Sequence, residues 1–205
     1  MNDKDRAYFM HLLYVCNDTK RKENARRTYE RYMASNKTEG GLTSFRSDEQ
    51  LVNIFAFALM PNHYHLLVQQ IVDDGIAAFM QRVGTGYTMY FNLTQSRSGS
   101  LFQGTYKRAL VNDTSYMLHI PHYIHANPVV LTEEIDSKSV YNFLTSYKWC
   151  SLRDYAGYYN YGSVLHKQFL EEVYGGSAHL LKDFRGYVEE GLQNEHVPPG
   201  LLLDA

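Results

Sequence analysis

The spacing of hydrophobic residues differs from one part of the chain to another, and the clearest pattern predicts a β-hairpin. The run LVNIFAFALM at 51–60 is short, apolar and rich in β-forming residues. A proline and an asparagine follow as a turn signal, and HYHLLV at 63–68 then alternates with the period of a strand. The pattern predicts a β-hairpin whose second strand carries His63 and His65 on the same face.

Apolar residues at intervals of three and four predict helices before and after this hairpin. Helices are expected at 3–16, at 25–33 within a charged stretch, and at 76–91. Gly84 and Gly86 lie inside the last of these, where each glycine costs about 1 kcal/mol relative to alanine. Close approach of another backbone is one reason for a glycine at such a position.

The second half of the chain predicts one more strand and further helices. Residues 101–111 have the composition of a strand, 114–127 form a helical pattern after the capping residue Asp113, and 180–192 form another. Pro121 falls inside the middle helix, where its missing N–H and its ring should kink or restart the helix. The expected fold class is therefore α+β.

Composition narrows the class of protein. The 205 residues, 44% hydrophobic and 20% charged, suffice for one domain with a sizeable core. The net charge of -2 argues against a strongly basic nucleic-acid binder, although a local basic surface fits within such a total. Cys16 and Cys150 are far apart, which excludes a disulfide framework and a thiolate zinc site. With no signal peptide and no apolar run near about 20 residues, we expect a soluble, cytoplasmic protein without a membrane span.

The histidine pair points to a metal site. Two neutral imidazoles on one strand face can hold a divalent cation, and a hard ion such as Mg²⁺ or Mn²⁺ needs further oxygen ligands. Asn127 lies four residues after Tyr123, so on a helix its amide and the phenol share one face. A phenol beside a metal-bound phosphate can attack phosphorus, although its ordinary pKa of about 10 requires help with deprotonation.

Each feature also has an ordinary structural interpretation. An HxH pattern on an apolar strand more often packs and hydrogen-bonds than binds metal, and most of the 18 tyrosines must be core or surface phenols. His119, His122 and His125 are expected to be solvated or locally bonded, with substrate contact as the alternative for His122 and His125, which flank Tyr123. Lys107 and Arg108 are interpreted either as a solvated strand edge or as phosphate contacts.

Four blocks of sequence occur in the order and approximate spacing of a known family. They are MPNHYHLLV (60–68), YTMYFN (87–92), SGSLFQGTYK (98–107) and HYIHANPV (122–129). Together they resemble the REP-associated tyrosine transposases, a branch of the single-tyrosine HUH transposases. The resemblance covers about residues 51–130 and continues weakly in SYKWCSLRDY at 146–155.

The resemblance implies a ferredoxin-like α+β fold, in which an antiparallel sheet with helices on one face carries the histidines and a helix presents the tyrosine. It implies that His63, His65 and Asn127 hold Mg²⁺ or Mn²⁺ and that Tyr123 is the nucleophile. The family cuts single-stranded DNA beside an imperfect hairpin. The cut leaves a 5′-phosphotyrosine and a free 3′-hydroxyl that can reverse the reaction, and no ATP is required.

Hairpin DNA is the partner that the resemblance implies, and a monomer is the expected working state, with a dimer as the alternative. Five side chains are candidates for DNA contacts through stacking and charge: Tyr87, Tyr90, Tyr106, Lys107 and Arg108.

The start of the chain departs from the family pattern. Members usually begin with a strand, whereas this chain begins almost directly at the first predicted helix. In a ferredoxin-like sheet that strand is interior, so its absence leaves backbone groups of its neighbours unpaired unless another segment replaces it. We expect a catalytic domain at 1–130 and an aromatic-rich helical extension at 131–205 packed on it.

Two other functions stay open. One is a domesticated or truncated relative that binds hairpin DNA without cutting it. The other is a small zinc-dependent hydrolase built on the histidine pair. Such a hydrolase needs another strong ligand, and the sequence has neither an HExxH motif nor paired cysteines to supply one.

Overall fold

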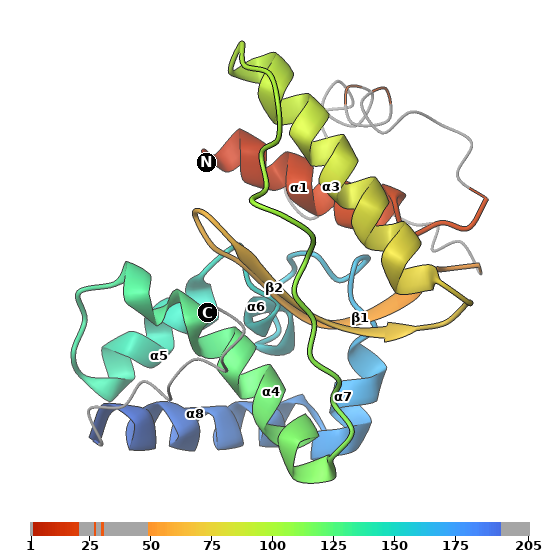
Figure 1. Cartoon of the computed structure of the whole chain (residues 1–205). Coiled ribbons are helices and arrows are strands. Elements are labelled where there is room, and N and C mark those ends of the chain that lie inside the picture. The colour runs from red at the N-terminus through yellow and green to blue at the C-terminus, as the bar shows by residue number, and fades with distance from the viewer. Residues whose placement is uncertain (1, 21–26, 28–29, 31–48, 194–205) are drawn as a thin grey trace. The chain divides into compact units, whose positions relative to one another are not determined.

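The computed structural model describes residues 2–20, 27, 30 and 49–193. Its fold is α+β, as predicted, because two antiparallel strands form the sheet and most of the other described residues are helical. The elements are α1 (Asp3–Val15), β1 (Val52–Leu59), β2 (Tyr64–Gln70), α3 (Gly75–Thr94), α4 (Thr114–Ala126), the 3-10 helix η1 (Asn127–Leu131), α5 (Ser137–Ser146), α6 (Leu152–Tyr155), α7 (Lys167–Tyr174) and α8 (Ser177–Gln193) (Figure 1).

Most of the elements predicted from apolar spacing are confirmed. The hairpin forms, and helices occupy the stretches predicted at 3–16, 76–91, 114–127 and 180–192. The helix predicted at 25–33 falls almost wholly on residues outside those described. No helix in the described part of the chain is long and apolar enough to cross a membrane.

One local prediction is wrong, and another is wrong in part. The stretch predicted as a strand, 101–111, has no strand, and residues 107–110 are exposed. β-propensity yields a strand only where a neighbouring strand offers hydrogen bonds and a face for packing, and the described sheet contains β1 and β2 alone. Of the kink or restart predicted at Pro121, the restart does not occur, since α4 continues through this residue as one helix.

The first compact unit combines residues 1–53, 68–106 and 161–164. In this unit α1 packs against α3, and Figure 1 shows the two helices side by side. A Cβ on Gly86 would lie 3.0 Å from Leu12 Cδ2, tighter than an ordinary contact. Close approach of the two helices therefore accounts for one of the glycines inside α3.

The side chain of Asn17 pairs the beginning of β1 within this unit. Its Nδ2–H donates to Val52 O (2.8 Å), and its Oδ1 accepts from Val52 N–H (2.9 Å), both in buried surroundings. The amide thus satisfies one donor and one acceptor of the strand, as the backbone of a neighbouring strand would do.

The second compact unit combines residues 54–67, 107–160 and 165–205, with the last range described to 193. It contains most of β1, the first half of β2 and every helix from α4 to α8. Within it α8 packs against α4, α5, α6 and α7, and its apolar face includes the buried Leu180 and Phe184. The boundary predicted at residue 130 stays a prediction.

In this unit a segment from the C-terminal half pairs the outer edge of β1. Residues 149–151 run antiparallel to it, with a bridge between Ala58 and Cys150. The hydrogen bonds are Leu59 N–H to Trp149 O (2.8 Å), Ser151 N–H to Phe57 O (3.0 Å), Tyr155 Oη–H to Phe55 O (2.8 Å) and His166 N–H to Ile54 O (2.8 Å). These bonds satisfy backbone groups at the edge of β1 that β2 does not pair.

Candidate active site

The two histidines of the hairpin lie next to each other at the start of β2. Their ring centroids are 5.0 Å apart, and the ring planes are nearly perpendicular at 89°. His63 is exposed just before the strand, and His65 is half-buried within it. The backbone holds this end of the hairpin closed, since Met60 N–H donates to His63 O (2.9 Å).

The amide of Asn62 orients the first of these rings. His63 Nδ1 lies 2.8 Å from Asn62 Oδ1, and an amide oxygen only accepts hydrogen bonds. The contact therefore assigns the proton to Nδ1 and leaves the lone pair of Nε2 for a ligand. A metal-binding histidine is usually oriented in this way, by a hydrogen bond from the nitrogen that does not bind the metal.

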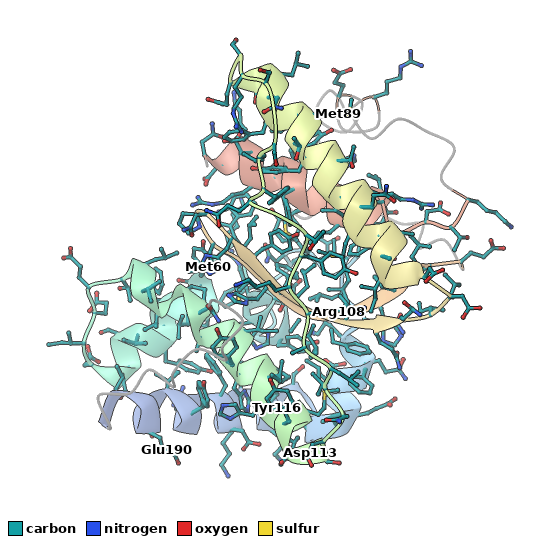
Figure 2. The ribbon with its side chains drawn as sticks, in the orientation of Figure 1. Met60, Met89, Arg108, Asp113, Tyr116 and Glu190 are labelled. Carbon is teal, nitrogen blue, oxygen red and sulfur yellow. The ribbon has the colours of Figure 1, made fainter. Side chains whose placement is uncertain are left out.

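α4 supplies the tyrosine. Asp113 caps the helix by accepting a hydrogen bond from Tyr116 N–H (3.0 Å), and Figure 2 labels both residues at this end of α4. Ile120 and Ile124 are buried, and packing of that face fixes the rotation of the helix. Tyr123 is also largely buried, with 7% of its surface exposed.

Tyr123 and His65 meet within the second unit. Their ring centroids are 5.7 Å apart, and the planes cross at 82° in an edge-to-face arrangement. The two residues are far apart in the sequence and come from different elements, and the folded chain brings their rings side by side.

Asn127 lies at the end of α4, one turn after the tyrosine. Its Nδ2–H donates to Tyr123 O (2.9 Å), which turns the amide back along the helix. The bond uses the nitrogen of the amide and leaves Oδ1, a hard oxygen donor.

These side chains fit a divalent cation by the chemistry of their donor atoms. Two imidazole nitrogens and one amide oxygen make an incomplete set that suits Mn²⁺ or Mg²⁺ with open positions for phosphate oxygens. Among the described residues, no group of three or more His, Cys, Asp or Glu side chains could hold a metal ion. A site at the histidine pair therefore needs the asparagine or the substrate to complete it.

His125 lies at the centre of a buried contact that the sequence did not reveal. Its ring has no exposed surface, and Nε2 lies 2.8 Å from Ser151 Oγ. Ser151 in turn bonds both backbone groups of Phe57 on β1. The prediction of a solvated or locally bonded ring is therefore wrong for His125, whose partner lies 26 residues away.

Burial also sets the charge of the histidines on α4. Removal from water lowers the pKa of His122 to about 4 and that of His125 to about 3. Both rings are therefore neutral at physiological pH, and His122 packs among aromatic rings of the C-terminal helices: Tyr174, Phe184 and Tyr187. His119 on the same helix is exposed, as expected.

Two of the five predicted DNA-contacting residues pack against aromatic rings of α1 in the first unit. Tyr87 is 1% exposed and meets Phe9 edge-to-face at 5.2 Å, so its ring has no free face for a base. Tyr90 stacks on Tyr8 at 3.9 Å, and its hydroxyl donates to Asp5 (3.2 Å). We correct the prediction by removing Tyr87 from the candidate set, whereas Tyr90, which is half-buried, stays a prediction.

The other three lie on the irregular segment before α4. Lys107 and Arg108 are exposed, and Tyr106 is half-buried. Figure 2 labels Arg108 on the extended stretch of chain that leads to α4. These side chains can still reach a phosphate or a base, and they stay candidates for DNA contacts.

Comparison with known proteins identifies the family. Residues 24–127 match the family model described as "Transposase IS200 like", which is just over half of the 205-residue chain. Neither a curated protein nor a solved structure matches the chain. The matched stretch contains the hairpin with both histidines and ends at Asn127, so it includes His63, His65, Tyr123 and Asn127. The chain belongs to the family of IS200-like transposases.

Proposed function

We propose that this transposase cleaves and rejoins single-stranded DNA at hairpin sequences through a covalent 5′-phosphotyrosine at Tyr123, as in the REP-associated branch. The observation that carries the proposal is the edge-to-face contact between Tyr123 and His65, with ring centroids 5.7 Å apart. Both residues belong to one compact unit of one chain, which supports a monomer as the working state.

The proposed step exchanges one phosphate ester for another. Tyr123 Oη attacks the phosphorus, the Oη–P bond forms, and the bond from phosphorus to the 3′-oxygen breaks. The phenol loses its proton to solvent, and the departing 3′-oxygen takes one up. Attack by a 3′-hydroxyl on the phosphotyrosine runs the same exchange backwards, so the energy of the phosphodiester is kept.

The residues around the tyrosine have separate roles in this proposal. His63, His65 and Asn127 would hold Mg²⁺ or Mn²⁺, which when bound supplies charge stabilisation for the nonbridging phosphate oxygens. The hydrogen bond from Asn127 Nδ2 to Tyr123 O fixes the Asn127 side chain on the same turn of the helix as Tyr123. Lys107, Arg108 and Tyr106 would contact the DNA backbone or an unpaired base, because two carry positive charge and one is aromatic.

A single gel experiment tests the function. Purified protein is incubated with Mg²⁺ or Mn²⁺ and a labelled hairpin strand, and a covalent protein–DNA band is sought under denaturing conditions. We expect the band with the parent chain and with Tyr116→Phe, a matched tyrosine on the same helix, and none with Tyr123→Phe. The band should also disappear with a chelator.

The outcomes separate the competing functions. Retarded DNA without a covalent band in the parent would assign the chain to the non-cleaving binders. A covalent band that survives Tyr123→Phe would move the nucleophile to another residue. Metal analysis of His63→Ala tests the hydrolase, since tight zinc binding that persists in this variant removes the histidine pair from the site.

A further inference from the structure

We propose that His125 is a positioning residue for the nucleophile, because its bond to Ser151 fixes α4 on β1 and thereby holds the Tyr123 ring against the His65 ring. The inference rests on the proposed function, in which these two rings belong to one active site. The inference also gives a role to Ser151, which lies beyond the stretch matched by the family model.

Three hydrogen bonds at Ser151 use the one proton and both lone pairs of its hydroxyl. Phe57 N–H donates to Ser151 Oγ (2.9 Å), and Oγ–H donates to Phe57 O (3.2 Å). A hydroxyl has one proton and two lone pairs, so one acceptor position is left, and His125 Nε2 lies 2.8 Å from it. His125 therefore donates through Nε2–H and completes the set.

The opposite assignment is unfavourable. If Ser151 gave its proton to His125 Nε2, the ring would carry its own proton on Nδ1, which is buried without a hydrogen-bond partner among the described residues. Either assignment leaves Nδ1 without a partner among these residues, and a buried N–H donor without a partner, which costs about 1–3 kcal/mol, is rarer in folded proteins than an acceptor without one. The proton therefore lies on Nε2.

The bond joins the two elements that carry the chemistry. His125 lies two residues after Tyr123 on α4, and Phe57 lies in the middle of β1. β1 pairs with β2, which carries His65. A continuous path of side-chain and backbone hydrogen bonds thus runs from the helix of the tyrosine to the strand of the histidine, entirely inside the second unit.

The surroundings keep this path in one arrangement. Tyr155 and Phe184 flank the His125 ring, with centroids 5.7 and 6.2 Å away. Tyr155 is itself bonded to β1, so the ring cannot turn without moving residues that hold the sheet. Close packing of this kind transmits a displacement instead of absorbing it.

His122 provides a matched comparison on the same helix. It is buried among aromatic rings like His125, but the described structure records no hydrogen bond for it, and its neighbours lie on α7 and α8. Replacement of either histidine by phenylalanine keeps a buried aromatic ring, and only the change at His125 breaks the link to β1.

The test uses the full chain and four variants. His125→Phe removes the donor, His125→Gln keeps an N–H at the position of Nε2, Ser151→Ala breaks the link from the other side, and His122→Phe is the control. Three quantities are measured: the single-turnover rate of adduct formation at saturating hairpin DNA, the Kd for the same DNA without metal, and hydrogen exchange of the α4 amides.

We expect His125→Phe and Ser151→Ala to slow adduct formation by about 10- to 100-fold, because small misplacement of a nucleophile has effects of this size. The Kd should stay within about twofold, exchange of the α4 amides should rise, and His125→Gln should recover most of the rate. His122→Phe should behave like the parent. If His125→Phe does not fold, Ser151→Ala carries the test.

The outcomes distinguish this inference from the proposed function. An active parent whose rate is unchanged in His125→Phe overturns the positioning role, as does equal loss in His122→Phe or in His125→Gln. A parent that forms no adduct refutes the cleavage function. In that case hydrogen exchange alone tests whether the bond from His125 to Ser151 holds α4 on β1. If the α4 amides of both His125→Phe and Ser151→Ala exchange as they do in the parent, the inference is overturned.

Discussion

Acid should destabilise the second unit through His122 before most carboxylates are protonated. The folded ring, buried among aromatic side chains, has its pKa lowered to about 4, and in the unfolded chain an imidazole titrates near about 6.5. Between these values the unfolded state binds more protons, so the free energy of unfolding falls as the pH falls. Full stability is present only above the unfolded pKa.

The magnitude follows from the size of the pKa shift. A depression of about 2.5 units at about 1.36 kcal/mol per unit gives about 3 kcal/mol lost by pH 4. Asp183 opposes the shift and His119 adds to it, but burial is the largest cause. The pKa of His125 is lowered in the same direction, mainly by burial and to a smaller extent by His122, so burial of His125 acts on both the parent and a His122 variant.

Denaturant unfolding of the parent and of His122→Phe at about pH 7 and about pH 4.5 measures the effect. The difference between the two proteins isolates His122, because the lowered pKa values of Asp113, Asp136 and Glu171 act on both. We expect the parent to lose about 2 kcal/mol more than the variant over this range. Equal losses in the two proteins would refute a neutral, desolvated His122.

Three further predictions concern side chains that make specific hydrogen bonds. Asn62→Ala should weaken Mn²⁺ binding about tenfold, measured by calorimetry, because it removes the acceptor that orients His63. Tyr155→Phe should lower the free energy of unfolding by about 1–2 kcal/mol in urea, since a buried β1 carbonyl loses its donor. Asn17→Ala should cost about 2–4 kcal/mol in the same assay, because both bonds to Val52 disappear, and a change below about 1 kcal/mol would contradict this account.

Local pattern is enough to predict the two elements that carry the candidate site residues. The alternation of 63–68 predicted the histidine strand, and the interval from Tyr123 to Asn127 predicted two side chains on one turn. Spacing alone could also have excluded Tyr87 as a DNA contact, because it continues the buried helical stripe of Phe79 and Val83.

Contacts between distant residues could not be predicted in this way. The link from His125 to Ser151 depends on how the C-terminal half packs, and an imidazole in an apolar helix gives no sign of its partner. The strand predicted at 101–111 failed for a related reason, since strand formation depends on a neighbour that local sequence does not specify.

The closing of the β1 edge by the C-terminal segment has a consequence for how the chain folds during synthesis. Phe57 and Ser151 are 94 residues apart, and Phe55 and Tyr155 are 100 residues apart. A ribosome therefore releases the apolar strand long before it makes the residues that cover it, and loops of this length close slowly. Before translation has passed Tyr155, the nascent chain exposes the unpaired backbone edge of the apolar strand β1. We therefore expect the nascent chain to need chaperones during this period.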